Sequence, residues 1–159
     1  MTITITPAPI RKSLRVECNP KRAFEVFTAR MGTWWHPDHT LLKSQREAVI
    51  LEPRSGGRWY ERAVDGSEYN WGHVIAWEPP ARILLAWQLD GQWQFNPGLV
   101  TEIEVRFIPD GKDATRVELE HRNIERFAEH AEAARAALDA PDGWSGGLAR
   151  FAALANARD

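Results

Sequence analysis

The stretch that decides the fold is residues 101–121, which read TEIEVRFIPDGKDATRVELEH. In its first half Ile103, Val105 and Phe107 alternate with charged residues, and its second half repeats this pattern. Such alternation predicts two strands, each with one covered face and one solvated face. The Pro-Asp-Gly-Lys segment at 109–112 predicts the turn of a β-hairpin between them. We therefore expect an antiparallel sheet whose solvated face sets glutamates opposite arginines.

Outward from this hairpin, turn signals divide residues 47–100 into further short runs of aliphatic and aromatic residues, and residues 10–18 add a strand. The run at 69–77 is ambiguous, because its composition favours Trp71 and His73 on the inner face. The opposite alternation would place Gly72 and Val74 on the inner face. A β-bulge within the strand would allow part of both sets to face inward.

Two helical segments complete the pattern. Asn19-Pro20 predicts a helix N-terminus, and we expect this helix to run to about Arg30 and Gly32 to end it. After the sheet, apolar residues at helical spacing predict a long C-terminal helix with an interruption at 141–143. The expected class is α+β, a curved antiparallel sheet of about six strands around that helix.

Length and composition fit one folded domain. The chain has 159 residues, 43% of them hydrophobic, and a net charge of 20 − 22 = −2. We expect residues 1–9 to be a mobile lead-in and residues 10–157 to form the domain. The charge lacks the basic excess of a nucleic-acid binder, and no apolar run approaches a membrane span. We therefore expect no nucleic-acid or membrane partner and, since the N-terminus does not resemble a signal peptide, a cytoplasmic protein.

Several segments resemble one known family in order and spacing. They are Pro53-Arg54-Ser55-Gly56-Gly57-Arg58-Trp59, then Gly72-His73-Val74 with Glu78-Pro79-Pro80-Ala81-Arg82-Ile83, then the pair of strands at 101–107 and 115–121, and finally Gly143-Trp144 with Leu148, Phe151 and Leu154. The chain is thereby similar to the AHSA-type branch of the START-like (SRPBCC) superfamily, named for the C-terminal domain of the activator of heat-shock protein 90 ATPase. The resemblance runs from about Ile10 to Leu154.

The resemblance implies a helix-grip fold, in which the sheet grips the last helix and leaves a cavity for an apolar molecule. It also implies a link to the stress response through the chaperone. We therefore expect binding of a hydrophobic or aromatic small molecule rather than catalysis. One alternative is a protein-interaction module, either a chaperone ATPase regulator or a homodimer built on the aromatic loop at Trp93 and Phe95. A further alternative is an enzyme that acts on a hydrophobic substrate in the same cavity.

Eight tryptophans in so short a chain indicate either a bulky core or an aromatic-lined pocket. Strand parity turns Trp59 and Trp87 inward, and Glu61 lies on the same face as Trp59. A buried Glu61 is a candidate acid or base, whereas one near the cavity mouth would pair with Arg58 or Arg62. The predicted ligand-binding residues are Trp35, Trp59, Glu61, Trp71, Trp87, His121 and Trp144.

The remaining polar candidates are histidines and one cysteine. His121 shares its strand face with apolar residues, so it either orients a ligand in the cavity or caps the last helix. The WHPDH segment at 35–39 offers two imidazoles but no third rigid ligand, so we predict an exposed lid and no metal. Cys18 has the pattern of a buried, inert thiol. Phosphate-binding and dinucleotide motifs are absent from the sequence, so we expect no cofactor and assign no catalytic residue.

Overall fold

Seven strands form one antiparallel sheet in the computed structural model, which describes residues 6–157. The strands are β1 (Ile10–Val16), β2 (Arg46–Leu51), β3 (Arg58–Ala63), β4 (Glu68–Glu78), β5 (Arg82–Trp87), β6 (Thr101–Pro109) and β7 (Thr115–Arg122). Their order across the sheet is β1-β7-β6-β5-β4-β3-β2, so the first strand pairs with the last. The sheet therefore has seven strands where about six were expected.

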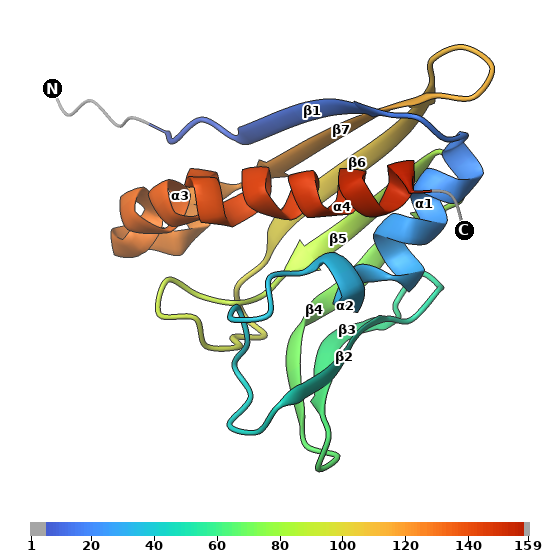
Figure 1. Ribbon diagram of the computed structural model, residues 1–159. Helices are drawn as coiled ribbons and strands as arrows, with labels where there is room; N and C mark the ends of the chain where they lie inside the picture. The colour runs from blue at the N-terminus through green and yellow to red at the C-terminus, as the bar shows by residue number, and fades with distance from the viewer. Residues whose placement is uncertain (1–5, 158–159) are drawn as a thin grey trace, which may run out of the picture.

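The helices gather on the concave side of the curled sheet (Figure 1). They are α1 (Pro20–Ala29), α2 (Met31–Trp34), the 3-10 helix η1 (Ile124–His130), α3 (Ala131–Asp139), the π-helical turn η2 (Pro141–Ser145) and α4 (Gly146–Asn156). Figure 1 shows α4 lying along the sheet, with α1 beyond one end of it and α3 at the other. This arrangement confirms the expected α+β class, with a C-terminal helix interrupted at 141–145.

The hairpin predicted at 101–121 is confirmed. Val105 pairs with Leu119 and Phe107 with Val117, and all four side chains are buried. Gly111 takes φ 89 in the turn, a left-handed conformation that glycine adopts without steric strain. The local alternation of this hairpin therefore predicted both its pairing and its buried face.

The first helix begins as predicted but ends differently. The Asn19 side chain accepts a hydrogen bond from the backbone N–H of Arg22 at 2.9 Å, which caps α1. The prediction that Gly32 ends this helix is wrong, because α1 ends at Ala29 and Gly32 lies inside α2. A Cβ atom on Gly32 would lie 2.8 Å from the backbone nitrogen of Val49. The glycine is thus explained by close contact with β2 rather than by helix termination.

Two bulges resolve the ambiguous strand β4. Trp71 is an extra residue in the pairing with β3, and Ile75 is an extra residue in the pairing with β5. The first bulge turns Trp71 inward next to Gly72, and both are buried. His73 pairs with Ala86 on the opposite face and contacts Gln88 through Nδ1. The pattern that placed Trp71 on the inner face is therefore right at the bulge, and the pattern that placed Gly72 and Val74 there is right after it.

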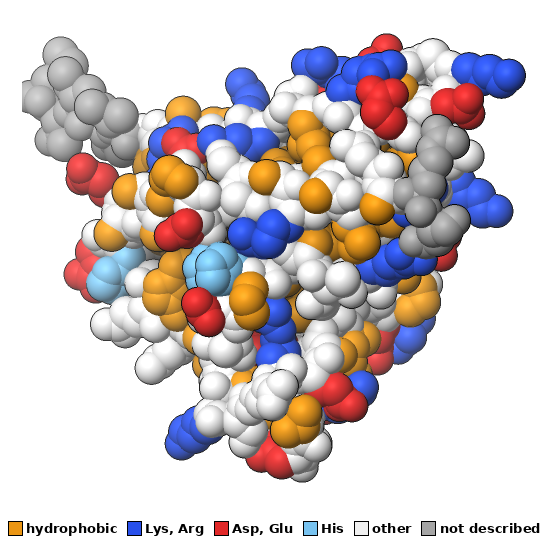
Figure 2. All heavy atoms as spheres, viewed as in Figure 1, with side chains coloured by type: hydrophobic (Ala, Val, Ile, Leu, Met, Phe, Trp, Pro, Cys, Tyr) orange, Lys and Arg blue, Asp and Glu red, His pale blue; other side chains and the backbone are white. Residues whose placement is uncertain are grey.

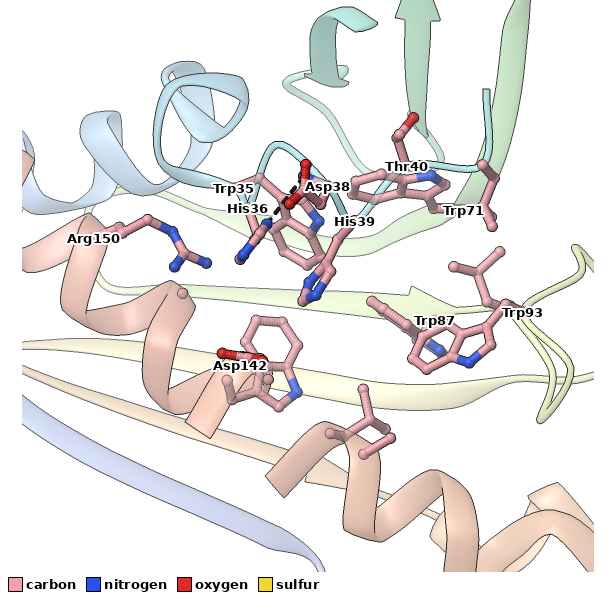
Figure 3. Close-up of a pocket in the computed structure, with 17 residues that line it drawn as sticks. Trp35, His36, Asp38, His39, Thr40, Trp71, Trp87, Trp93, Asp142 and Arg150 are labelled. Atoms are coloured by element: carbon pink, nitrogen blue, oxygen red, sulfur yellow. Dashed lines mark hydrogen bonds between the residues drawn. The ribbon is translucent and has the colours of Figure 1, made fainter. Parts of the chain in front are cut away.

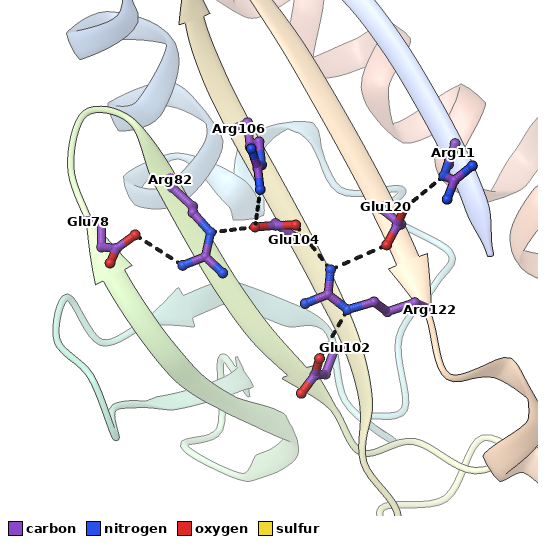
Figure 4. Close-up of polar contacts among 8 residues, drawn as sticks. All are labelled: Arg11, Glu78, Arg82, Glu102, Glu104, Arg106, Glu120 and Arg122. Carbon is purple, nitrogen blue, oxygen red and sulfur yellow. Dashed lines mark hydrogen bonds and ion pairs between the residues drawn. The ribbon is translucent and has the colours of Figure 1, made fainter.

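The convex face of the sheet carries a network of charged side chains (Figure 4). Glu104 accepts hydrogen bonds from Arg82, Arg106 and Arg122. Arg122 also donates to Glu102 and Glu120, on β6 and on β7. The network bridges β5, β6 and β7. Arg106 lies opposite Glu118 as expected, whereas Glu104 lies opposite Glu120, and Arg122 donates to both of these carboxylates.

The core between the sheet and the helices is filled with aromatic side chains. Phe27 of α1 lies 5.8 Å from Phe107 of β6 and 5.4 Å from Phe151 of α4, measured between ring centroids. Trp77, beyond the second bulge, packs against Phe24 at 5.0 Å. This half of the concave side is therefore solid, and space remains at the other end, near α3.

The described part of the N-terminal segment is bound to α3. Of the lead-in predicted at residues 1–9, residues 1–5 lie outside the described part of the chain. The carbonyl oxygens of Ala8 and Pro9 accept hydrogen bonds from Arg135 of α3. Within residues 6–157, no helix is both long enough and apolar enough to span a bilayer.

Candidate functional site

A pocket of about 390 Å³ opens where the loop after α2, the end of β5 and the α3–α4 junction meet. This volume lies in the usual range for small-molecule sites. The pocket is lined by Trp35, His36, Asp38, His39, Thr40, Leu41, Trp71, Trp87, Leu89, Trp93, Ala137, Leu138, Asp142, Gly143, Trp144, Gly147 and Arg150. Figure 2 shows histidine side chains reaching the surface on this face, below α4, with acidic and basic side chains around them.

Trp35 lies at the centre of the aromatic part of the pocket. Its ring centroid is 4.9 Å from that of Trp71, 5.7 Å from that of Trp144 and 6.2 Å from that of Trp59. The ring is half-buried, and it separates the open pocket from the filled core. Tilted and edge-on contacts of this kind are the favoured arrangements of aromatic rings, so they define a rigid apolar wall.

Trp93 forms the outer edge of this wall. Its backbone has φ 61, and 43% of the residue is exposed. The Asp90 carboxylate accepts hydrogen bonds from the backbone N–H groups of Gln92 and Gln94, which holds the loop in its turn. The Trp93 ring then lies edge-on to Trp87, with 6.3 Å between centroids. A strained backbone that presents an exposed aromatic ring at a pocket is typical of ligand-binding positions.

The polar part of the pocket lies opposite Trp71, Trp87 and Trp93 (Figure 3). The imidazoles of His36 and His39 stack with 4.3 Å between centroids and 17° between planes. His36 Nδ1 accepts a hydrogen bond from the backbone N–H of Asp38 at 3.0 Å. The ring proton of a neutral His36 therefore sits on Nε2 and is available to donate.

Two arginines hold the loop that carries these histidines. The Arg46 guanidinium donates to the carbonyl oxygens of Trp35, His36 and His39, at 3.0 to 3.2 Å. Arg150 of α4 donates from Nε to the carbonyl oxygen of Trp34 at 2.9 Å. The loop is thus fixed by side chain–backbone bonds from both sides, and the terminal nitrogens of Arg150 remain beside the pocket.

The surroundings of His39 favour its neutral form. Partial desolvation beside the pocket lowers its pKa, and the charge of Arg150, together with that of His36 when it is protonated, lowers the pKa further. Asp142 and Asp38 act in the opposite direction but do not outweigh these effects. His39 is therefore an unprotonated base at neutral pH.

Glu61 lies behind the pocket wall and is fully buried. Its carboxylate accepts hydrogen bonds from Thr40 Oγ1, from the backbone N–H of Leu41 at 3.0 Å and from Trp71 Nε1 at 2.7 Å. The alternative in which Glu61 pairs with Arg58 or Arg62 near the mouth is wrong. These arginines lie on the opposite face of β3 and pair with Glu68 and Glu47.

His121 is also buried behind the wall. Burial lowers its pKa to about 3, so the ring is neutral. Its Nδ1 accepts from Trp144 Nε1 at 3.1 Å, which places the ring proton on Nε2, 2.8 Å from Thr101 Oγ1. His121 therefore positions Trp144, and it caps no helix with these bonds.

The predicted site residues fall into two groups. Trp35, Trp71, Trp87 and Trp144 line the pocket, whereas Trp59, Glu61 and His121 lie one layer behind it. A direct role of any of them in binding stays a prediction. Residues 37–39 are exposed, as expected, but sequence reasoning missed that His36 and His39 line the pocket and form its polar wall.

Arg150 was missed although the sequence contains a signal for it. It is the only charged residue between Gly143 and Asn156, and it lies one helical turn after Gly147. A lone cation on the same helix face as small residues is a recognisable pattern. Within residues 6–157, no group of three or more histidine, cysteine, aspartate or glutamate side chains is arranged to hold a metal ion.

Comparisons with solved structures find proteins similar to this chain in sequence and fold. An anthrahydroquino-gamma-pyrone synthase, Txn09, is 42% identical over 94% of this chain and 97% of its own, with a TM-score of 0.66. The self-sacrificing resistance protein CalC from Micromonospora echinospora is 29% identical over 93% of this chain and 94% of its own, with a TM-score of 0.71. Protein MLL2253 from Mesorhizobium loti, 16% identical over 96% of this chain and 99% of its own, shares the fold with a TM-score of 0.67.

A search of curated proteins finds no match. The family model described as Activator of Hsp90 ATPase homolog 1-like protein matches residues 17–156. With the curled sheet, the C-terminal helix and the pocket between them, this match places the chain in the Activator of Hsp90 ATPase homolog 1-like family.

Proposed function

We propose that the protein binds a planar aromatic small molecule in the pocket beside Trp35. The observation that carries this proposal is the wall of five tryptophans, Trp35, Trp71, Trp87, Trp93 and Trp144, around a cavity of about 390 Å³. Burial of apolar surface against rigid rings drives association at roughly 25 cal/mol per Å². The relatives named as a pyrone synthase and as a resistance protein support a small-molecule ligand.

The test uses anthraquinone, a planar molecule without an ionisable group, and measures quenching of tryptophan fluorescence. We expect saturable quenching at micromolar concentration. Trp93→Ala should weaken binding by about tenfold, because one aromatic contact contributes up to about 1.5 kcal/mol. A matched control is Ile108→Ala, since Ile108 is 38% exposed on β6 and does not line the pocket. Quenching that does not saturate would contradict the proposal. Equal weakening of anthraquinone binding by Trp93→Ala and Ile108→Ala would contradict it as well.

A second candidate is catalysis of ring closure on the bound molecule. It is favoured by the relative named as a synthase and by an unprotonated imidazole, His39, at the pocket. Addition of a hydroxyl oxygen to an activated double bond is an isomerisation, so it needs acid and base groups but no oxidant. A suitable probe is 2′-hydroxychalcone, which closes to flavanone with a change in absorbance. Acceleration over buffer that is lost in His39→Gln would support this function, and a rate equal to buffer would exclude it for this substrate.

The chaperone-regulator and homodimer alternatives stay predictions. Trp93, on which the homodimer interpretation rested, lines the pocket and contacts Trp87, and this favours a ligand-binding role for its ring.

A further inference from the structure

The two walls of the pocket differ in chemistry. Figure 3 shows Arg150 and Asp142 on the side of α4, with His36 and His39 between them and the rings of Trp87 and Trp93. A purely apolar ligand would leave this polar wall facing hydrocarbon without hydrogen-bond partners, which is unfavourable. The ligand that fits both walls is therefore an aromatic molecule with a polar group at one edge.

The polar wall has two donors with unused capacity. Arg150 uses Nε on the Trp34 carbonyl oxygen, and within residues 6–157 its terminal nitrogens have no hydrogen-bonded or ion-paired partner. His36 uses Nδ1 as an acceptor, so the Nε2–H of its neutral form is a second donor. Two such donors beside one cavity can hold a single oxygen atom that carries negative charge.

The same wall has one free basic nitrogen. In the described part of the chain, the His39 imidazole makes no hydrogen bond or ion pair, and its ring contact is the stack on His36. The titratable and charged groups that face it are His36 and Asp38 on its own loop, Arg150 on α4 and Asp142 on η2. A neutral imidazole next to two donors is the arrangement of an acid–base site.

We propose that this wall ionises a hydroxyl group of the bound aromatic molecule, with His39 taking the proton and Arg150 and His36 holding the resulting oxygen anion. The inference rests on the proposed function. In this step the ligand O–H bond breaks, an N–H bond forms on His39, and the electron pair stays on the oxygen and delocalises into the ring. The substrate class is a phenol or enol conjugated to a fused aromatic system.

The two acidic groups favour this class over a carboxylic acid. Asp38 and Asp142 are exposed near the wall and repel a ligand that is already anionic at neutral pH. A phenol enters as a neutral molecule and meets no such repulsion until it ionises beside Arg150. A carboxylate, in addition, has no proton for His39 to take.

The test follows the ionisation of alizarin, a hydroxylated anthraquinone whose neutral and anionic forms absorb at different visible wavelengths. Alizarin is titrated from pH 4 to pH 9 with the protein in excess and without protein. We expect the midpoint of the bound dye to lie at least one pH unit below that of the free dye, a tenfold shift in its ionisation constant. His39→Gln and Arg150→Gln should each move the midpoint back toward the free value.

Controls separate this inference from the proposed function. His130→Gln changes a histidine whose side chain is 41% exposed and does not line the pocket, so it should leave the midpoint of the bound dye in place. Arg150→Lys retains the charge and should keep most of the shift if Arg150→Gln fails to fold. Anthraquinone binding with an unshifted alizarin midpoint overturns the inference and leaves the proposed function intact. A shift that persists in His39→Gln overturns the assignment of the base, and failure of both dyes to bind overturns both proposals.

Discussion

His121 is a single buried side chain, behind the pocket wall, whose protonation makes the stability of the fold depend on pH. Strand parity predicted its inward direction, because alternation along β7 is a local property of the chain. Its hydrogen bonds to Trp144 and Thr101 join residues more than 19 positions away, and no local pattern reports such contacts. The sequence therefore predicted where the ring points but not which groups it contacts.

The lowered pKa of His121 makes stability depend on pH in a defined direction. In the unfolded chain the imidazole binds a proton below about pH 6.5, whereas burial keeps the folded pKa at about 3. Between these values the unfolded state binds more protons, so stability falls as the pH falls. Between pH 6.5 and pH 4.5 this residue alone should remove about 2 kcal/mol from the free energy of unfolding.

The measurement is urea denaturation of the wild type and of His121→Gln across this range. Glutamine can accept from Trp144 and donate to Thr101 but does not titrate, so the variant should lose about 2 kcal/mol less on acidification. His130→Gln changes a half-exposed histidine and should retain the slope of the wild type. Equal slopes for the wild type and His121→Gln would show that His121 is protonated in the folded protein.

The loop after α2 illustrates what is decided at the level of elements. Its backbone has little regular structure, and Glu61 of β3 fixes it by accepting from Thr40 and from Leu41 N–H. Glu61→Leu keeps a side chain of similar size but leaves the partly buried backbone N–H of Leu41 and the buried Nε1–H of Trp71 without an acceptor. Each unsatisfied buried donor costs about 1 to 3 kcal/mol, so unfolding free energy should fall by about 2 to 4 kcal/mol.

The matched variant is Glu61→Gln. Its amide oxygen can replace Oε2 toward Leu41 and Trp71, while its NH₂ group donates to Thr40 Oγ1. We expect Glu61→Gln to lose less than half as much stability as Glu61→Leu, measured by chemical denaturation at pH 7. Equal losses in the two variants would mean that the charge of Glu61, rather than its acceptor geometry, holds the loop.

The charged face of the sheet provides a second prediction at this scale. Burial acts to raise the pKa of Glu104, but hydrogen bonds from Arg82 and Arg122 and the charge of Arg106 outweigh it and lower the pKa to about 2. The stabilisation is therefore present above pH 4.5 and is lost as the pH falls toward 2. Glu104→Gln should reduce unfolding free energy at pH 7 by about 1 to 2 kcal/mol, and by less at pH 3.

Glu118→Gln is the control for this network. Glu118 is 44% exposed at its side chain and pairs with Arg116 alone among the described residues, so the change should stay within about 0.5 kcal/mol. Both variants are compared by urea denaturation at pH 7 and pH 3. If Glu104→Gln lowered the free energy of unfolding as much at pH 3 as at pH 7, the negative charge of Glu104 would not be the source of the stabilisation.

At the scale of the elements, the sequence predicted structure correctly wherever that structure depends on residues close together in the chain. The hairpin at 101–121 and the cap at Asn19 were predicted correctly because each depends on neighbours in the chain. The bulges at Trp71 and Ile75 were not located, since a bulge is defined by the partner strands. Gly32 was misread because its function is contact with Val49, which is distant in sequence.

The whole molecule builds the pocket from segments far apart in the chain. Trp35, Trp71, Trp87 and Trp144 were predicted as site residues because a cavity in this fold recruits bulky aromatic groups, and all four line it. The polar wall could not be predicted in the same way, because it needs the loop at 36–39 and Arg150 of α4 to meet. Only the packing of α2 and α4 brings these segments together.

This construction predicts how a ligand should affect the entire fold. Because residues 35–41, 87–93 and 137–150 share one cavity, a bound molecule must be released before any of them can open. Hydrogen exchange with saturating anthraquinone should therefore slow in all three segments together, by up to about 100-fold when the dye stands at 100 times its Kd. The turn between β6 and β7 at 110–114 lies outside the pocket and should exchange at an unchanged rate. Protection confined to one segment would mean that the three segments do not form one cavity in solution. Protection that includes the turn at 110–114 would mean that the dye binds elsewhere.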